Sequence, residues 1–385
     1  MTARENFPVP RRESRALTAR RRAIPALTGL RFFAALHVIV FHTRIKAELY
    51  ARGHVYAGNF IANGFLAVTL FFMLSGFILA YNYNGQIESL GHAIRFWEAR
   101  YARIWPAYLF SLLCSSIPLS NVPSFWPAVA TIFMVQAWNP FHAQCGYWNM
   151  VCWSLSVEAF FYLLFPWLQT TIEKLRRSHL VGFGIFIGAL GILANTPNHI
   201  MSIRYAGPFF YIIVPIIHLP EFIAGMTLGN LFLTNRVTHS ENRSRLQAGD
   251  EFGTLSRRNR FPWITVLGFI SSVVVMLIAR SRWESLVIAT FSLLLYGLAA
   301  EQSPLSRFLS MPALILGGEI SYSMYLLRTP LHGWLALSPA LSASSLVTLL
   351  YIPLGLTPLS LFSYFVIETA ARRGLRRMFA NMHRS

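Results

Sequence analysis

The sequence is poor in charged residues, and acidic residues are the scarcer kind. Only 12% of its 385 residues are charged, and just 15 are Asp or Glu. Soluble domains carry about 25% charged residues. A chain with so few charges cannot cover a water-facing surface of ordinary size, so the composition excludes a typical soluble domain.

Cysteine is also scarce, with three residues in the whole chain. Cys114 lies in an apolar stretch, where an inert packing role is expected. Cys145 and Cys152 lie in a polar loop, and no His or further Cys beside them completes a metal-binding pattern, so no metal site is predicted. A disulfide between these two would form only if the loop faces an oxidising compartment.

Apolar and basic residues are abundant instead. The chain is 55% hydrophobic and holds 31 Phe and 10 Trp, which suit lipid-facing and interfacial positions. Its net charge of +18 would suggest nucleic-acid binding in a soluble protein, but no binding module of that kind is present. The basic residues lie mainly between apolar stretches, as the positive-inside rule predicts. The expected partner is therefore membrane lipid and not nucleic acid.

Apolar stretches recur along the whole chain, and most are long enough for the roughly 20 residues that cross a bilayer as a helix. The predicted fold class is an all-α integral membrane protein, a bundle of about ten transmembrane helices. Pro215 and Pro220 predict a kink or a break in one of them. The predicted spans are 26–44, 62–83, 103–121, 152–170, 180–196, 206–234, 262–280, 283–300, 312–332 and 342–367.

One further apolar piece, 125–138, is shorter than a span, and the basic residues decide its place. If it does not cross, 26 of the 33 basic residues fall on one side of the membrane and six on the other. If it crossed, Lys174, Arg176 and Arg177 would move to the outer side and every later segment would invert. The segment is therefore predicted to be re-entrant or interfacial, with both chain termini in the cytoplasm.

Two ionisable residues in the first span are candidate site residues, because charge within a bilayer is costly. Arg31 and His42 are eleven residues apart, within roughly 20° of one helix face and about 16 Å apart along the axis. That face would carry a cation near the cytoplasm and an imidazole deep in the membrane. The alternative is structural, with Arg31 as a snorkelling anchor and His42 as a packing hydrogen bonder.

A carboxylate follows in a later span. Ser154, Glu158 and Tyr162 share one helix face at four-residue spacing. Glu158 needs a partner there, and His42 or Arg31 is available. A Glu–His pair would raise the basicity of the imidazole, as a general base requires, whereas a Glu–Arg pair would be a structural clamp.

Arginines also gather beside aromatic residues between the second and third spans, from Arg95 to Tyr108. Arg100 and Arg103 there could hold a phosphorylated, nucleotide-bearing ligand through bidentate contacts and stacking. The alternative is positive-inside anchoring. In the second span, Ser75 and Gly76 allow close helix approach, and packing is their expected role.

Six segments in chain order resemble the acyltransferase 3 family, the membrane-bound O-acyltransferases of bacterial surface polysaccharides, Nod factors and some antibiotics. Each segment is weak alone, whereas six in order are specific. They are Gly29 to His42, with the family's Arg-x10-His spacing, Phe71 to Phe77, Arg100 to Pro106, Trp153 to Pro166, Leu219 to Gly225, and Ile320 to Leu327.

The resemblance implies acyl transfer from a cytoplasmic acyl-CoA, with acetyl-CoA the expected donor and no bound cofactor. The implied acceptor is a hydroxyl group of a saccharide, a glycolipid or a glycosylated small molecule. The implied location is the bacterial cytoplasmic (inner) membrane. The expected catalytic residues are His42, Arg31 and Glu158, and the expected donor-binding residues are Arg100, Arg103 and Ser75.

The expected organisation is one transmembrane acyltransferase domain over 26–368, with a cytoplasmic loop near 235–261. The flanking segments 1–25 and 369–385 are expected to be basic cytoplasmic tails.

The chain departs from the family pattern at three positions. Thr28 stands where the family usually has Asp, Ala159 where a second Glu is common, and Arg328 where His often follows the Tyr-Leu-Leu run. The last departure bears on the role of the final helices and on acceptor choice. Two other functions remain open: a transporter or flippase of a lipid-linked saccharide, and a non-catalytic membrane scaffold. The ordered segments and the lack of an inverted repeat favour the enzyme.

Overall fold

The computed structural model describes residues 23–117, 122–138, 148–205, 215–247, 262–278, 286–336 and 350–383, and every regular element within them is a helix. The predicted all-α class is thus confirmed for this part of the chain. The helices are α2 (Pro25–Phe41), α3 (Ile45–Ala51), α4 (Val55–Ala62), α5 (Leu66–Tyr83), α6 (Leu90–Ser115), α7 (Phe125–Ile132), α8 (Cys152–Ile172), α9 (Arg177–Tyr205), α11 (Pro215–Gln247), α12 (Trp263–Ile278), α13 (Val287–Ala300), α14 (Pro304–Leu309), α15 (Pro312–Ala336), α18 (Thr357–Phe362) and α19 (Thr369–Met382). Short 3-10 or π-helical turns join some of them: η1 (Asn63–Phe65), η4 (Ile352–Leu356) and η5 (Ser363–Glu368).

The number of membrane spans is smaller than predicted when length and apolarity are applied to the described helices. Three stretches are long and apolar enough to cross a bilayer: Val55–Tyr83, Pro215–Arg236 and Ile352–Met382. A fourth is added if α2 and α3, which meet at 66°, form one broken span. About ten spans are therefore not confirmed. Helices such as α12 and α13, with 16 and 14 residues, fall short of the roughly 20 needed.

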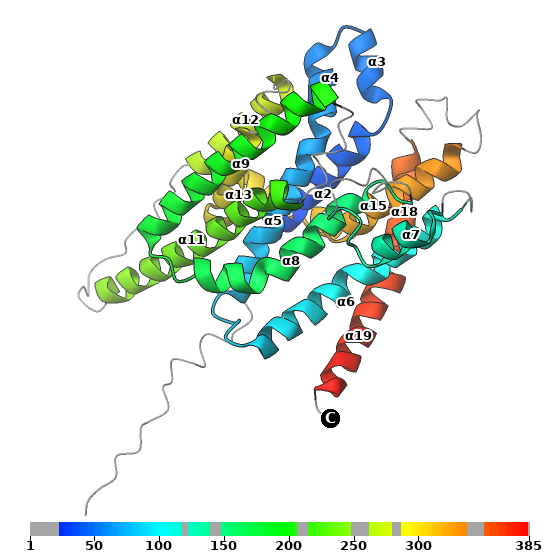
Figure 1. Ribbon diagram of the computed structural model, residues 1–385. Helices are drawn as coiled ribbons and strands as arrows, with labels where there is room; N and C mark the ends of the chain where they lie inside the picture. The colour runs from blue at the N-terminus through cyan, green and yellow to red at the C-terminus, as the bar shows by residue number, and fades with distance from the viewer. Residues whose placement is uncertain are drawn as a thin grey trace, which may run out of the picture.

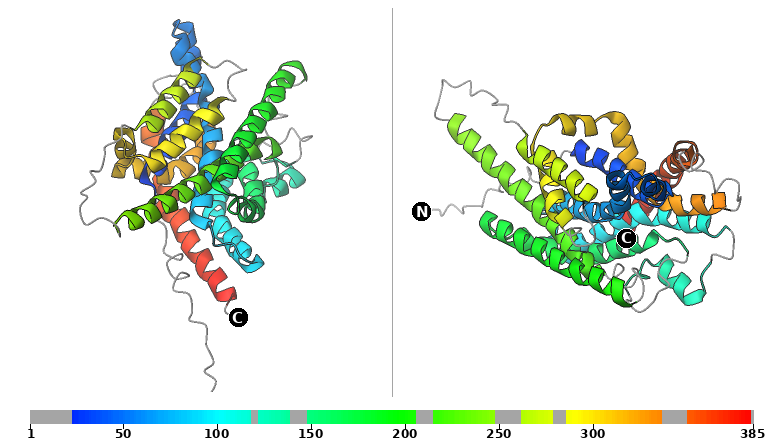
Figure 2. Two further views of the ribbon diagram at one scale, coloured as in Figure 1. Left: turned by 90° about the vertical axis from the view of Figure 1, so that its left-hand side faces the viewer. Right: turned by 90° about the horizontal axis from the view of Figure 1, so that it is seen from above.

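The helices form one elongated bundle with α2 and α5 at its centre (Figure 1). Helices α9, α11, α12 and α13 lie on one side of this pair and α6, α15 and α18 on the other, while α8 crosses between them and packs against both α11 and α6 (Figures 1 and 2). We call the end of the bundle where α2 begins and α5 ends the basal end. The end where α2 ends and α5 begins is the distal end. Helix α19 projects from the bundle at the basal end.

Several helices meet backbone to backbone through glycine, among them α5 with α11 and α2 with α15. A Cβ atom on Gly76 of α5 would lie 2.1 Å from the carbonyl oxygen of Phe222 in α11, and one on Gly225 of α11 would lie 2.0 Å from that of Met73. A Cβ on Gly318 of α15 would lie 1.8 Å from the carbonyl oxygen of Thr28 in α2. The packing role predicted for Gly76 is confirmed, because only glycine permits these contacts.

Prolines inside two helices leave carbonyl groups that neighbouring helices satisfy. Pro166 in α8 has no N–H to donate to the carbonyl of Tyr162, and the indole Nε1 of Trp97 donates to it at 2.9 Å. Pro330 in α15 likewise leaves the carbonyl of Leu326 without a backbone N–H donor, and Asn149 Nδ2 donates to this carbonyl at 3.0 Å. These bonds tie α6 to α8 and the start of α8 to α15.

The apolar piece 125–138 turns back after a short helix. Helix α7 has 8 residues, or about 12 Å, which is far less than a bilayer. The chain then turns at Met134, whose φ of 57° is unusual for a residue with a side chain. Gln136 Nε2 donates to the carbonyl of Cys152 at 3.0 Å, and Ala137 N to Ser156 Oγ at 3.0 Å. The segment therefore docks on the start of α8, in agreement with the prediction that it does not cross.

Segment boundaries differ from the sequence prediction in two places. Helix α11 continues to Gln247, so the expected loop 235–261 begins as helix; residues 248–261 lie outside the described residues. The expected tail 369–385 is the helix α19 as far as Met382. Pro215 begins α11 and Pro220 lies inside it, whereas the first part of span 206–234 lies outside the described residues.

Two further predictions fall partly on residues without a description. The N-terminal tail 1–25 is described only from residue 23. Cys114 and Cys152 are buried free thiols, and Cys145, the proposed disulfide partner of Cys152, lies outside the described residues.

Candidate active site

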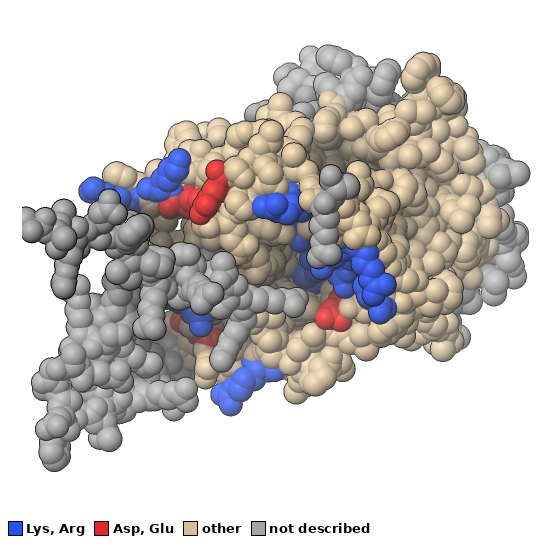
Figure 3. Space-filling model, turned by 90° about the horizontal axis from the view of Figure 1, so that it is seen from below, with Lys and Arg blue, Asp and Glu red and all other residues tan. Residues whose placement is uncertain are grey.

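A cavity of about 490 Å³ lies between the central helices and α6, α8, α15 and η5. That size is within the usual range for small-molecule sites, about 300–1,000 Å³. Five of the six residues predicted as site residues line it: Arg31, Ser75, Arg100, Arg103 and Glu158. Seen from the basal end, basic and acidic side chains gather near a hollow in the surface (Figure 3). The cavity thus joins residues from four helices that are far apart in sequence.

Glu158 is the centre of a hydroxyl network in this cavity. Ser75 Oγ donates to Glu158 Oε1 at 2.9 Å, and the Tyr162 hydroxyl donates to the same oxygen. The predicted common face of Ser154, Glu158 and Tyr162 is confirmed, because all three line the cavity. Ser154 lies one turn from Glu158 and bonds the hydroxyl of Tyr325 at 2.8 Å. The carboxylate is therefore held by hydroxyl groups and is not clamped by an arginine.

Among the described residues, no carboxylate lies within ion-pair distance of the arginines of the cavity. In the described part of the chain, the two ion pairs within 4.0 Å are His218–Glu221 and His383–Glu98. Neither includes Arg31, Arg100 or Arg103. Arg103 projects into the cavity with protein around it and is within electrostatic reach of Arg31, Arg100 and Glu158.

Arg100 stacks near aromatic rings at the basal end of the cavity. Its guanidinium carbon lies 5.7 Å from the centre of the Tyr83 ring and 5.9 Å from that of Phe96. Its Nε is buried and has no hydrogen-bond acceptor. A buried donor without a partner is costly. The arrangement resembles a prepared contact for an anion, since a planar guanidinium fixed by rings retains its fork of donors.

Two carboxylates at the basal side of the cavity were not assigned to the site from sequence. Glu368 is buried, accepts a hydrogen bond from Ser323 and is within electrostatic reach of Arg31, Arg103 and Arg372. Glu319 accepts a bond from the hydroxyl of Tyr364 at 2.8 Å. In the sequence, both residues lie near the ends of predicted spans. Only the packing of η5 and α15 against α6 brings them beside the arginines.

Two tyrosines of α15 also line the cavity and were missed as site residues. The Tyr322 hydroxyl donates to the carbonyl of Ile104 in α6 at 2.9 Å, and Tyr325 bonds Ser154 of α8. Both lie in the segment Ile320–Leu327, so the signal was present as a run of Ser and Tyr at helical spacing. They fix α15 to the two helices that carry Arg103 and Glu158.

His42 lies apart from this cavity, at the distal end. Helix α2 ends at Phe41, and His42 is its C-terminal cap residue, with its ring beside that of Phe41 at 4.7 Å between centres. The charged groups that act on His42 are Arg328, Lys46 and His332. His42 is partly exposed, so the expected imidazole deep inside one continuous helix is not what the structure has.

The predicted pairing of Glu158 with His42 is therefore wrong. Glu158 bonds Ser75 in the middle of α5, whereas His42 lies beyond the end of α2. Spacing along one helix fixed the angle between Arg31 and His42 but could not reveal where that helix stops. His37, on another face of α2, bonds the carbonyl of Phe60 in α4 at 2.7 Å and is a packing residue.

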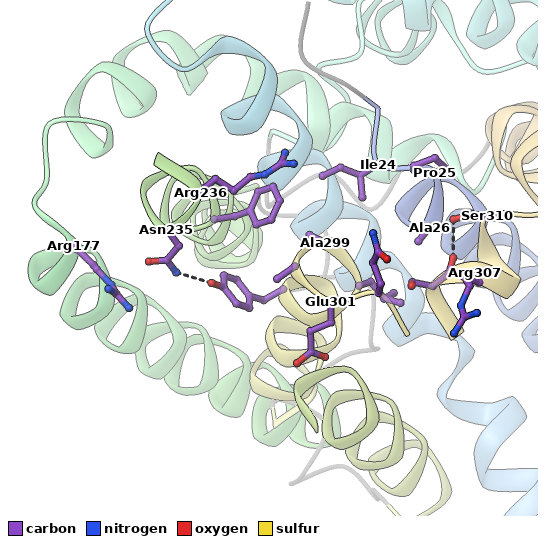
Figure 4. A pocket seen from close by; sticks show the side chains of 16 residues that line it. Ile24, Pro25, Ala26, Arg177, Asn235, Arg236, Ala299, Glu301, Arg307 and Ser310 are labelled. Carbon is purple, nitrogen blue, oxygen red and sulfur yellow. Dashed lines mark hydrogen bonds between the residues drawn. The ribbon is translucent and has the colours of Figure 1, made fainter. Parts of the chain in front are cut away.

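A second basal cavity, of about 810 Å³, lies beyond the start of α2 and between the ends of α9, α11 and α13. Arg177, Arg236 and Arg307 point in different directions around it, and Asn235 donates to the Tyr296 hydroxyl at 2.5 Å (Figure 4). Glu301 accepts from Thr265 N at 2.8 Å and so caps α12. None of the predicted site residues lines this cavity. Among the described residues, no group of three His, Cys, Asp or Glu side chains could hold a metal ion.

Comparison with known proteins links the whole bundle to one family. A family model described as an acyltransferase domain matches residues 24–367. The chain is 28% identical over 229 residues to the acyltransferase MdmB of Streptomyces mycarofaciens, covering 55% of this chain and 58% of that protein. It is 25% identical over 334 residues to the O-acetyltransferase OatA of Staphylococcus aureus, covering 80% of this chain and 51% of that protein.

The chain thus spans about half the length of these curated relatives. No solved structure matches it.

Proposed function

The chain belongs to the acyltransferase 3 family, and from that premise we propose that it is an integral-membrane O-acyltransferase. The donor proposed is an acyl-CoA, with acetyl-CoA first, and the acceptor is a hydroxyl group of a saccharide or glycoconjugate. One observation supports this most strongly. The cavity of about 490 Å³, which we call the donor cavity, gathers Arg31, Arg100 and Arg103 around a carboxylate–hydroxyl network, and no described carboxylate pairs with them.

That cavity suits a phosphorylated donor on charge and shape. Coenzyme A carries several phosphates, and arginine binds phosphate by paired, charge-assisted hydrogen bonds. Arg100 retains an unpartnered Nε beside two aromatic rings, onto which a nucleotide could also stack. In this proposal Arg100 and Arg103 hold the phosphates, while Ser75 and Tyr162, fixed by Glu158, contact the arm of the donor.

His42 is the general base of the proposed reaction. It takes the proton of the acceptor hydroxyl, whose oxygen attacks the thioester carbonyl carbon. The carbon–sulfur bond then breaks, and the leaving coenzyme A thiolate takes the proton back from the imidazolium. Arg31 lies eleven residues from His42, about 16 Å along the helix axis, so it holds the donor and does not touch the reacting carbonyl.

The proposed placement puts the basal end in the bacterial cytoplasm and the distal end at the outer side of the inner membrane. The excess of basic residues in the segments on the basal side supports this orientation. A donor from the cytoplasm would then reach an acceptor presented near His42 from the other side. Lipid surrounds the apolar helices, and both termini are cytoplasmic.

The test is acetyl transfer by the purified chain in lipid nanodiscs, followed as coenzyme A release in the presence of glycans extracted from the source membrane. We expect His42→Ala to lower kcat by about 10²–10⁴-fold, the usual contribution of a general base. His37→Ala is the matched control, because His37 shares the helix and bonds only a backbone carbonyl. A His42→Ala variant that folds and retains the wild-type rate would defeat the assignment. Saccharide movement across vesicles without any coenzyme A release would favour a flippase instead.

A further inference from the structure

Arg328 of α15 is a buried cation with no anionic partner among the residues that the structure describes. Only 5% of the surface of this residue is exposed. One nitrogen, Nη2, donates to the hydroxyl of the neighbouring Thr329 at 3.1 Å, while Nε is buried and has no acceptor. A charge in such a position is expensive unless something compensates it.

The groups around Arg328 do not provide that compensation. The ionisable groups that act on it are the phenols of Tyr325 and Tyr351. Arg328 in turn acts on His42, together with Lys46 and His332. None of these is a carboxylate, so the positive charges of Arg328 and Lys46 lie beside the imidazoles of His42 and His332 at the distal end without a negative charge among the groups that act on them.

The helix packing explains why these groups come together. Gly318 of α15 lies against Thr28 of α2, and the two helices run in the same direction from that contact. Ten residues further along α15, Arg328 is therefore level with Val38 of α2, about one helical turn before His42. Between the two contacts, Ile39 of α2 packs with Met324 and Leu327 of α15.

Arg328 also adjoins the donor cavity. Tyr325 lies one turn before Arg328 on the same helix, lines the cavity and bonds Ser154 of α8. Arg328 thus stands between the donor cavity and His42, the residue that we assign to the acceptor hydroxyl. A molecule that presents a hydroxyl to His42 would place its neighbouring groups near Arg328.

We propose that Arg328 binds a carboxylate or phosphate of the acceptor, so that the acceptor is an anionic saccharide or glycoconjugate. The inference rests on the proposed function, because it takes His42 as the place of the acceptor hydroxyl. Arginine is suited to this task, since its planar guanidinium pairs with two oxygens of a carboxylate or phosphate. The acceptor anion supplies the charge that the bundle lacks.

The first test is the stability of the ligand-free protein. If Arg328 has a structural role, its removal will destabilise the fold. If its charge is uncompensated, its replacement by a neutral residue of similar length will stabilise the fold. We expect Arg328→Met to raise the melting temperature of the purified full chain by about 2–4 °C. Arg95→Met, at an exposed arginine outside both cavities, is the control and should change little. A fall of several degrees in Arg328→Met would overturn the proposal.

The second test is binding of matched probes at constant ionic strength, with coenzyme A in excess. Methyl β-D-glucuronide is compared with methyl β-D-glucoside, and glycerol 1-phosphate with glycerol, so that the two sources of negative charge are distinguished. At least one anionic probe should raise the melting temperature more than its neutral partner. Arg328→Gln should abolish the difference, Arg328→Lys should retain part of it, and Arg95→Gln should retain all of it. Equal shifts in the wild type, or a difference that survives in Arg328→Gln, would contradict the proposal.

Turnover separates this role from stabilisation of the reacting carbonyl. With acetyl-CoA as donor, Arg328→Gln should lower the ratio of kcat/KM for the better anionic acceptor to that for its neutral partner by about tenfold or more. A residue that acts on the carbonyl would lower both values equally, and that result would overturn the inference while the proposed function stands. If no acceptor leads to coenzyme A release, the proposed function fails, and the binding comparison still decides whether Arg328 is an anion site.

Discussion

At the scale of single residues, the site combines arginines that have no described carboxylate at ion-pair distance with one carboxylate, Glu158, that is already hydrogen-bonded. Glu158 takes hydrogen bonds from Ser75 and Tyr162, and no arginine pairs with it at ion-pair distance. A ligand that brings phosphate into this cavity therefore finds guanidinium groups that need not first break an internal salt bridge. This favours donor affinity at some cost in stability, as functional sites commonly do.

Substitution of Arg103 tests how much these arginines contribute to the affinity for the donor. Removal of Arg103 should raise the KM or Kd for acetyl-CoA by about 10–100-fold, the usual worth of a lost charge-assisted hydrogen bond, and should change kcat much less. Arg95→Gln is the matched control, because Arg95 lies two turns earlier on α6 and is exposed. Isothermal titration with desulfo-coenzyme A measures binding without turnover. Unchanged donor affinity in Arg103→Gln would remove Arg103 from the donor site.

Part of this residue-level picture could be read from the sequence. Charged residues in apolar stretches are few, so Arg31, Arg103 and Glu158 were conspicuous, and helical spacing placed Ser154 and Tyr162 on the face of Glu158. Spacing cannot say which helix faces which. The partner of Glu158 from another helix is Ser75, for which the sequence indicated helix packing and the family resemblance implied donor binding, but not a bond to this carboxylate.

At the scale of helices, small residues and prolines determine which elements touch. Gly76 and Gly318 are sites of backbone contact, and the carbonyls left open by Pro166 and Pro330 are bonded by Trp97 and Asn149. The first kind of contact was predictable from a Ser-Gly pair in an apolar helix. The second was not, because nothing near a proline in sequence identifies the distant donor.

A glycine series tests the packing of these helices. Gly318→Ala should lower the free energy of unfolding by about 1–3 kcal/mol or more, because the added methyl group meets the carbonyl of Thr28 and the helices must separate. Gly182→Ala in α9 is the control, since nothing lies within 4 Å of a Cβ there. That change should be neutral or stabilising, as alanine is the better helix former. Thermal or denaturant unfolding measures both, and equal stability of the two variants would contradict the contact.

At the scale of the whole molecule, counting basic residues predicts an orientation in the membrane, whereas the structure limits how many described helices can be called spans. Short helices such as α12 and α13 lie in the predicted places but are too short to cross alone by length. Apolar windows in a sequence measure hydrophobicity and not helix length, so ten windows do not guarantee ten spans. The prediction that 125–138 does not cross rested on charge and not on apolarity, and the short α7 agrees with it.

Labelling of engineered cysteines tests the orientation. Arg52 lies between α3 and α4 at the distal end, and Gln86 follows α5 at the basal end; both are exposed. In a background with Cys145→Ser, Arg52→Cys should react with a membrane-impermeant maleimide in intact cells. Gln86→Cys should react only after permeabilisation. The reverse pattern would invert the chain, and labelling of both in intact cells would show that these ends are not on opposite sides.

The glycine contacts have a mechanical consequence. Where two backbones touch, no side chain can change rotamer to let one helix slide past the other, so the walls built from α2 with α15 and from α5 with α11 are stiff. The opposite wall, formed by α6 and α8, is joined through side chains: Trp97 of α6 donates to the carbonyl of Tyr162 in α8, and Ser75 of α5 donates to Glu158 in α8. We expect such a cavity to admit a bulky molecule by displacement of the α6–α8 wall, while the glycine contacts keep Arg31, Arg328 and His42 aligned.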